Sequence, residues 1–293
     1  MLRFSDLPIE LAEHVFSYII DLLEPGDLAT RVQLAGISKP IRGFLHRTAF
    51  RVVFMNHANW PVFACFADDE RAATETFAFT RVLHIVESAR YLRGWDILIS
   101  RILGHVNTVC APGAYYLRGQ LNMVTFIANA TYGMTPSAVL RSGPGIIRSH
   151  SASTNLRRLA FPIGASWGVH SMPTEWRERL LYQLSGLERV VLFIHTNSPD
   201  EGYNTASFGY DYLHEALTVA VETFLSMPQM QSVAVAFSTE DYAAEHRAVA
   251  ISIVEAKRDN RLFIQDRENV SDYLSCALQD ETWTSAKIST VSA

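Results

Sequence analysis

The chain has 293 residues, of which 48% are apolar, 19% charged and 11% aromatic. This composition is typical of a globular protein with a buried core, and it excludes a disordered or fibrous chain. The 25 basic and 30 acidic residues leave a net charge of −5. No overall positive charge therefore attracts the protein to nucleic acid or to anionic lipid, and we expect neither a nucleic acid nor a membrane as its partner.

Three cysteines, Cys65, Cys110 and Cys276, lie far apart and form no Cys-x-x-Cys pair. No histidine pair has the spacing of metal ligands, so we expect no disulfide framework, no metal and no cofactor. Acidic residues interrupt the N-terminal stretch where a secretory signal needs an apolar run, and no segment approaches about 18 apolar residues. We expect a soluble protein in the cytoplasm, the nucleus or both.

Three short helices are predicted in the N-terminal part of the chain. The first begins near Asp6, with Pro8 in its first turn, the second follows the capping residue Asp27, and the third begins near Ser38. Apolar residues recur every four positions in the first helix and form one stripe: Leu11, Val15 and Ile19. Helices this short cannot bury much surface without further partners.

From about residue 60 onward, short apolar strands follow helical stretches. Seven strands are predicted, at Arg81–Ile85, Val106–Ala111, Leu121–Ile127, Leu156–Phe161, Leu187–Ile194, Val233–Phe237 and Leu262–Ile264. Helices are expected before three of them, at Trp176–Leu184, Leu213–Leu225 and Tyr242–Ala256. Repeated helix-to-strand order predicts a mixed α/β fold with a parallel sheet.

Several strands share one spacing: an apolar residue, two others, a second apolar residue, one other and a third apolar residue. The triplets are Val106, Val109, Ala111; Leu121, Val124, Phe126; Leu156, Leu159, Phe161; Leu187, Val190, Leu192; and Met230, Val233, Val235. This spacing is typical of the strand of a leucine-rich repeat and predicts an irregular leucine-rich-repeat-like α/β solenoid. The intervals between triplets are uneven, so an ordinary α/β domain is the alternative.

One segment, residues 164–168, matches the G-x-S-x-G nucleophile elbow with Ser166 at its centre. Asp211 and His246 follow in the chain order of an α/β-hydrolase triad. However, Pro162 interrupts the run from strand to serine, and His246 falls within a predicted helix. A serine hydrolase that uses Ser166 is therefore kept as a minor alternative, and we expect that the protein is not an enzyme.

Aromatic and histidine residues elsewhere are interpreted as core residues. The aromatic-rich segment Trp60–Phe66 fits core packing better than a ligand contact. Three histidines lie at predicted strand ends and are interpreted as core-edge residues: His84, His105 and His195.

Within the N-terminal helices, a series of residues resembles the F-box, a three-helix module. The matching residues are Phe4, Leu7, Pro8, Glu10, Leu11, Val15, Phe16, Tyr18, Ile19, Asp27, Leu28, Ile37, Ser38, Lys39 and Arg42. The chain is similar to the F-box-like proteins of mushroom-forming fungi, including their segment after the F-box at Val52-Val53-Phe54 and their C-terminal Trp-x-x-Ala helix at Trp283. The resemblance divides the chain into an F-box-like helical unit at residues 1–54 and a substrate-recognition domain at residues 55–293.

The resemblance implies a substrate-recognition subunit of a cullin-RING ubiquitin ligase. Its F-box would bind a Skp-type adaptor, and its repeat-like domain would bind a protein substrate that the sequence does not name. Carried over residue by residue, the adaptor-binding set is Leu7, Pro8, Leu11, Val15, Phe16, Ile19, Leu28, Ile37 and Ser38. Some of these residues also hold the helices together. Because Pro40 and Ile41 depart from the family pattern, the alternative is a stand-alone interaction scaffold with a degenerate F-box.

Overall fold

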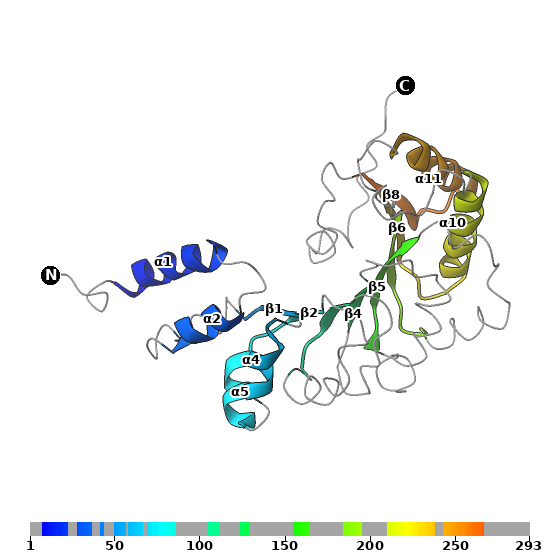
Figure 1. The fold of residues 1–293 in the computed structure, drawn as a ribbon. Coiled ribbons are helices and arrows are strands. Elements are labelled where there is room, and N and C mark those ends of the chain that lie inside the picture. The colour runs from blue at the N-terminus through cyan, green and yellow to red at the C-terminus, as the bar shows by residue number, and fades with distance from the viewer. Residues whose placement is uncertain are drawn as a thin grey trace. The chain divides into compact units, whose positions relative to one another are not determined.

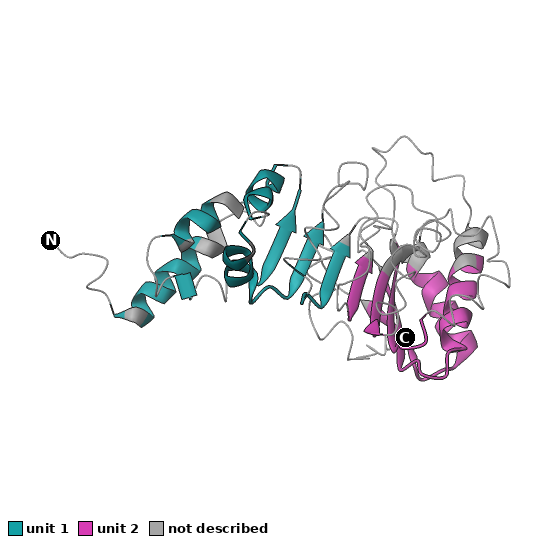
Figure 2. Cartoon of the chain, turned by 90° about the horizontal axis from the view of Figure 1, so that it is seen from below, with its two compact units in different colours: residues 1–110, 120–122 teal, residues 111–119, 123–293 magenta. Residues whose placement is uncertain are grey.

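A computed structural model gives the fold of the chain (Figure 1). The structure describes residues 8–22, 28–36, 42–43, 50–56, 58–66, 69–85, 103, 105–111, 124–128, 155–163, 184–194, 210–237 and 243–266. The chain forms two compact units, residues 1–110 with 120–122 and residues 111–119 with 123–293 (Figure 2).

The first unit begins with two of the predicted helices, α1 (Ile9–Leu22) and α2 (Leu28–Ala35). Pro8 lies immediately before α1, and its carbonyl oxygen accepts hydrogen bonds from the N–H groups of Leu11 and Ala12. Of the predicted third helix, residues 42 and 43 are described and are helical, and the rest lies outside the described residues.

Two further helices in the first unit were not predicted individually. These are α4 (Trp60–Cys65), with Pro61 in its first turn, and α5 (Glu70–Phe77). The Asp69 side chain caps α5 by accepting a 2.9 Å hydrogen bond from the N–H of Ala72. The aromatic side chains of the two helices meet each other, since the Phe63 and Phe77 rings stack with centroids 5.1 Å apart. The interpretation of the Trp60–Phe66 segment as core is therefore confirmed for Phe63, which is buried.

The strands of the first unit are β1 (Val52–Met55), β2 (Val82–Ile85) and β3 (Thr108–Ala111). They are parallel and adjacent in chain order, and Val53, Leu83 and Val109 lie in register. Strands β2 and β3 confirm two predictions, whereas β1 was not predicted. Asn59 follows β1, is buried, and donates from Nδ2 to the carbonyl oxygen of Phe54, which joins the end of the strand to the start of α4.

The second unit contains the other five predicted strands: β4 (Thr125–Ala128), β5 (Arg158–Ile163), β6 (Arg189–Ile194), β7 (Ser232–Phe237) and β8 (Leu262–Asp266). All pairs among them are parallel, and the strands again follow one another in chain order. The strand order does not reverse within the described part of either unit. A doubly wound nucleotide-binding sheet has its crevice where the order reverses, so these sheets lack that feature in their described parts.

Two of the three helices expected before strands are described in the second unit, α10 (Tyr210–Leu225) and α11 (Ala243–Lys257). They lie side by side, and both pack against β7 (Figure 1, Figure 2). The predicted helix at 176–184 lies outside the described residues apart from Leu184. α11 ends before Arg258, whose φ of 50° is left-handed and whose N–H bonds to the carbonyl of Val254.

The register of the sheet aligns most of the predicted apolar triplets. Leu159, Val190 and Val233 are partners across β5, β6 and β7, and all three are buried. The triplet predicted at Leu121, Val124 and Phe126 does not align with the others in the sheet, because Phe126 rather than Val124 pairs with Leu159. The aligned positions in β4 therefore begin two residues later than the sequence analysis expected.

Both faces of the sheet are buried in the middle of the second unit. Val190 and Leu192 lie on one face of β6, Val191 and Phe193 on the other, and all four are buried. Parallel sheets that are covered on both faces have continuous apolar strands of this kind. The mixed α/β class and the parallel strands are as predicted.

Candidate functional site

Helix α1 carries an apolar arc wider than a single buried stripe. Successive residues of an α-helix turn by about 100°, so Leu11, Val15 and Tyr18 fall within about 60° of one another. Ala12 and Phe16 continue the same arc about 100–140° from Leu11. The helix therefore has an apolar surface that is broad enough to face two different neighbours.

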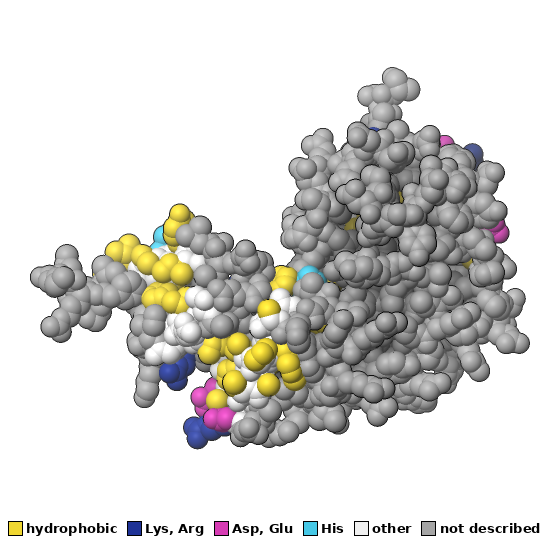
Figure 3. All heavy atoms as spheres, in the orientation of Figure 1, with side chains coloured by type: hydrophobic (Ala, Val, Ile, Leu, Met, Phe, Trp, Pro, Cys, Tyr) yellow, Lys and Arg dark blue, Asp and Glu magenta, His cyan; other side chains and the backbone are white. Residues whose placement is uncertain are grey.

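The structure buries only one half of this arc. Ala12 and Phe16 are 6% and 4% exposed, whereas Leu11, Val15 and Tyr18 are 51%, 38% and 66% exposed. We call these last three residues the α1 outer face. Hydrophobic side chains gather over α1 in Figure 3. A row of large apolar side chains left in water is unfavourable for an isolated domain and is typical of a surface that binds another protein.

The structure describes six of the nine predicted adaptor-binding residues. Pro8, Leu11 and Val15 are exposed, Ile19 is half-buried, and Phe16 is buried and supports the helix from within. Leu28 begins α2. Three of the predicted residues lie outside the described part of the chain: Leu7, Ile37 and Ser38.

Tyr18 belongs to the same surface but was not among the predicted site residues. It follows Leu11 by seven positions, which is two helical turns, and this spacing could have identified it. The polar edge of the α1 outer face includes Glu10 and His14, which are both exposed. The arrangement offers an apolar centre with charged or polar margins, as protein interfaces do, and it contains no nucleophile paired with a base.

The residues of the hypothetical hydrolase triad do not form a described site. Asp211 lies in the first turn of α10 and His246 lies within α11, as the sequence predicted for His246. Ser166 lies outside the described residues.

Two of the predicted core-edge histidines contact neighbouring elements. His84 is buried, and its ring lies 4.8 Å from the ring of Phe54 on the adjacent strand. His105 is exposed, and its Nε2 lies 2.9 Å from the carbonyl oxygen of Phe77. His195 lies outside the described residues.

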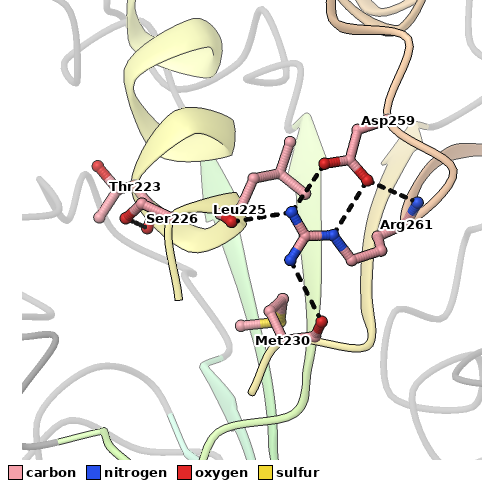
Figure 4. Close-up of polar contacts among 6 residues, drawn as sticks. All are labelled: Thr223, Leu225, Ser226, Met230, Asp259 and Arg261. Atoms are coloured by element: carbon pink, nitrogen blue, oxygen red, sulfur yellow. Dashed lines mark hydrogen bonds and ion pairs between the residues drawn. The ribbon is translucent and has the colours of Figure 1, made fainter. Parts of the chain in front are cut away.

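Among the described residues of the second unit, a cluster of polar contacts surrounds Arg261 (Figure 4). Its guanidinium donates to Asp259 through Nε at 3.0 Å and Nη2 at 2.8 Å, and to the carbonyl oxygens of Leu225 and Met230 at 3.0 and 3.5 Å. The hydrogen bond from Arg261 lowers the pKa of Asp259, against the opposing effect of burial, and the same bond raises the pKa of Arg261. This cluster connects the end of α10 to the starts of β7 and β8, so its role is structural.

Within the described residues, no three His, Cys, Asp or Glu side chains gather in a way that could hold a metal ion. No described helix is both long and apolar enough to cross a membrane. No model of a known protein family matches the chain, and no curated protein is similar to it.

Proposed function

We propose that the protein is a substrate receptor of a cullin-RING ubiquitin ligase, which binds a Skp-type adaptor through the α1 outer face. The single observation that carries this proposal is the half-exposed apolar arc of α1, with Leu11, Val15 and Tyr18 exposed and Phe16 buried on the other half of the arc. The residues of α1 that resemble an F-box support an adaptor contact on the same helix.

The second unit would then bind the protein substrate. Its parallel strands follow in chain order and carry aligned apolar positions at Leu159, Val190 and Val233, which supports an irregular leucine-rich-repeat-like solenoid. A receptor of this kind needs no catalytic group of its own, because it raises the local concentration of a substrate near a catalytic centre on another subunit.

The experiment is co-purification of the full chain with a Skp-type adaptor. The test variant carries Leu11→Gln, Val15→Gln and Tyr18→Gln, because glutamine favours helix and removes apolar area without adding charge. The matched control is Phe79→Gln, which removes a side chain that is 43% exposed in the same unit but outside α1. We expect the adaptor to be retained by the wild type and the control and lost by the triple variant.

Two results would contradict this proposal. Adaptor binding that survives the triple substitution would exclude the α1 outer face as the contact. A wild-type protein that is folded yet binds no adaptor would favour the stand-alone scaffold. Thermal unfolding of each variant serves as the folding control, since substitutions at exposed positions change stability little.

A further inference from the structure

Two arginines stand side by side where the strands of the first unit begin. Arg51 immediately precedes β1 and Arg81 immediately precedes β2, and the next residues, Val52 and Val82, are register partners. The N–H groups of Arg81 and Val82 donate to the carbonyl oxygen of Arg51 at 2.9 and 3.1 Å. Adjacent strands lie about 4.8 Å apart, so the two exposed side chains start from neighbouring backbone positions.

The second unit has the same backbone arrangement with a different pair of charges. Arg157 and Glu188 immediately precede β5 and β6, and the N–H groups of Glu188 and Arg189 donate to the carbonyl oxygen of Arg157 at 2.9 and 3.0 Å. Here Nη1 of Arg157 lies 3.2 Å from Oε1 of Glu188, so the two side chains form an ion pair. In the first unit, Arg81 occupies the position that corresponds to Glu188.

The arginine pair of the first unit therefore has no equivalent of this carboxylate. Among the described residues, neither Arg51 nor Arg81 lies within ion-pairing distance of an aspartate or glutamate. Like charges on neighbouring strands repel each other, so a bound anion is favourable beside them. Each guanidinium presents paired N–H donors that match the two oxygens of a carboxylate.

An exposed aromatic side chain accompanies the two arginines. Phe79 is 43% exposed and lies two residues before Arg81, with the fully buried Thr80 between them. The N–H of Thr80 donates at 2.9 Å to the carbonyl oxygen of Phe77, and Nε2 of His105 lies 2.9 Å from the same oxygen. These contacts fix the turn that carries Phe79, so little conformational entropy would be lost when a ligand covers the ring.

This combination of residues favours a protein ligand over a nucleic acid. Aromatic residues and arginine are enriched in the cores of protein interfaces. The net charge of −5 repels a long polyanion as a whole, but a short acidic segment experiences mainly the local pair of arginines. Carboxylates of such a segment can pair with the guanidinium groups while a neighbouring apolar side chain covers Phe79.

We propose that Arg51, Arg81 and Phe79 form a docking surface for an acidic segment of another protein. Glutamate or aspartate carboxylates bind the two arginines, and an apolar side chain of the same segment packs on Phe79. This inference goes beyond the proposed function, because none of the three residues lies on α1 and the adaptor contact does not require them.

The test is fluorescence polarisation with the full chain and short labelled peptides of one length. The first peptide has a leucine between two pairs of glutamates, the second has glutamine in place of the glutamates, and the third has serine in place of the leucine. We expect the first peptide to bind, the second not to bind and the third to bind more weakly than the first. Added salt should weaken binding, because ions screen exposed charges.

Substitutions in the full chain assign the binding to the proposed residues. Arg51→Gln and Arg81→Gln should each weaken binding of the first peptide by about three- to fivefold, and the double variant by about tenfold or more, because single exposed ion pairs are weak. Phe79→Gln should remove the preference for the leucine peptide over the serine peptide. The matched control is Arg71→Gln, which removes one positive charge from an exposed position of α5 and should leave binding unchanged.

Three results would overturn the proposal: equal binding of the glutamate and glutamine peptides, equal weakening by Arg71→Gln, or no peptide binding by the folded wild type. A single-stranded DNA oligonucleotide that binds more tightly than the glutamate peptide, through the same arginines, would overturn it in favour of a nucleic-acid ligand. Peptide binding should survive the triple substitution on α1. Peptide binding by a wild type that binds no adaptor would support the docking surface and reject the receptor function, and the converse result would reject the docking surface alone.

Discussion

Helices α1 and α10 are both amphipathic, but their apolar residues are used differently. In α10, Leu217, Val221 and Phe224 are all buried against α11 and β7. In α1, Leu11 and Tyr18 are more than half exposed. The apolar surface of α10 is buried within its own unit, whereas part of the apolar surface of α1 remains exposed. This difference separates a structural helix from one that can also recognise a partner.

The largest effect that tests this comparison is expected in α10. Phe224→Ala removes a buried ring and leaves a cavity, so it should lower the free energy of unfolding by about 3–5 kcal/mol. Urea denaturation followed by circular dichroism would measure the change. A loss below about 1 kcal/mol would mean that α10 does not hold its unit together in the way that its burial indicates.

A smaller effect is expected where Arg261 holds the C-terminal end of α10. Arg261→Ala removes the donors to Leu225 and Asp259 and should cost about 1–3 kcal/mol in the same assay. Arg71→Ala is the matched control, because both side chains of its ion pair with Glu75 are exposed and the pair should contribute about 0.3–0.5 kcal/mol.

The same cluster predicts a pH dependence. Arg261 lowers the pKa of Asp259 in the folded state, so the ionised carboxylate stabilises the fold above its ordinary pKa of about 3.9. This contribution is lost as the pH falls through the lowered pKa. The wild type should therefore be more stable than Asp259→Asn at neutral pH, and the difference should shrink below pH about 4. A difference that is constant with pH would contradict the assignment.

Sequence patterns predicted the seven strands from Val82 onward because each combines an apolar run with a preceding helix or turn. They missed β1 because Val52–Met55 follows directly on the N-terminal helices and was interpreted as part of the segment after the F-box-like residues. The predicted register of β4 was also wrong by two residues. The apolar residues at 121, 124 and 126 have the expected spacing, but Phe126 rather than the residue at 124 pairs with Leu159.

The candidate site was predictable only in part. The spacing of Leu11 and Val15 identified an apolar face of α1, but spacing alone does not say how much of an apolar arc the rest of the protein covers. That depends on tertiary packing, which buries Phe16 and leaves Tyr18 in water. The neighbouring positions of Arg158 and Arg189 depend likewise on strand register, which the 30 residues between them in the sequence do not reveal.

The smallest effect is expected on the α1 outer face itself. Leu11→Ala and Tyr18→Ala should each change the free energy of unfolding by less than about 0.5 kcal/mol, because water already contacts most of each side chain. Phe16→Ala, five residues after Leu11 and two before Tyr18, should cost about 3 kcal/mol and serves as the control on the same helix. If the substitutions at Leu11 and Tyr18 lowered the free energy of unfolding as strongly as Phe16→Ala, both halves of the arc would belong to the core. If substitution of Leu11 and Tyr18 leaves the free energy of unfolding unchanged but abolishes adaptor binding, then different residues of α1 serve folding and recognition.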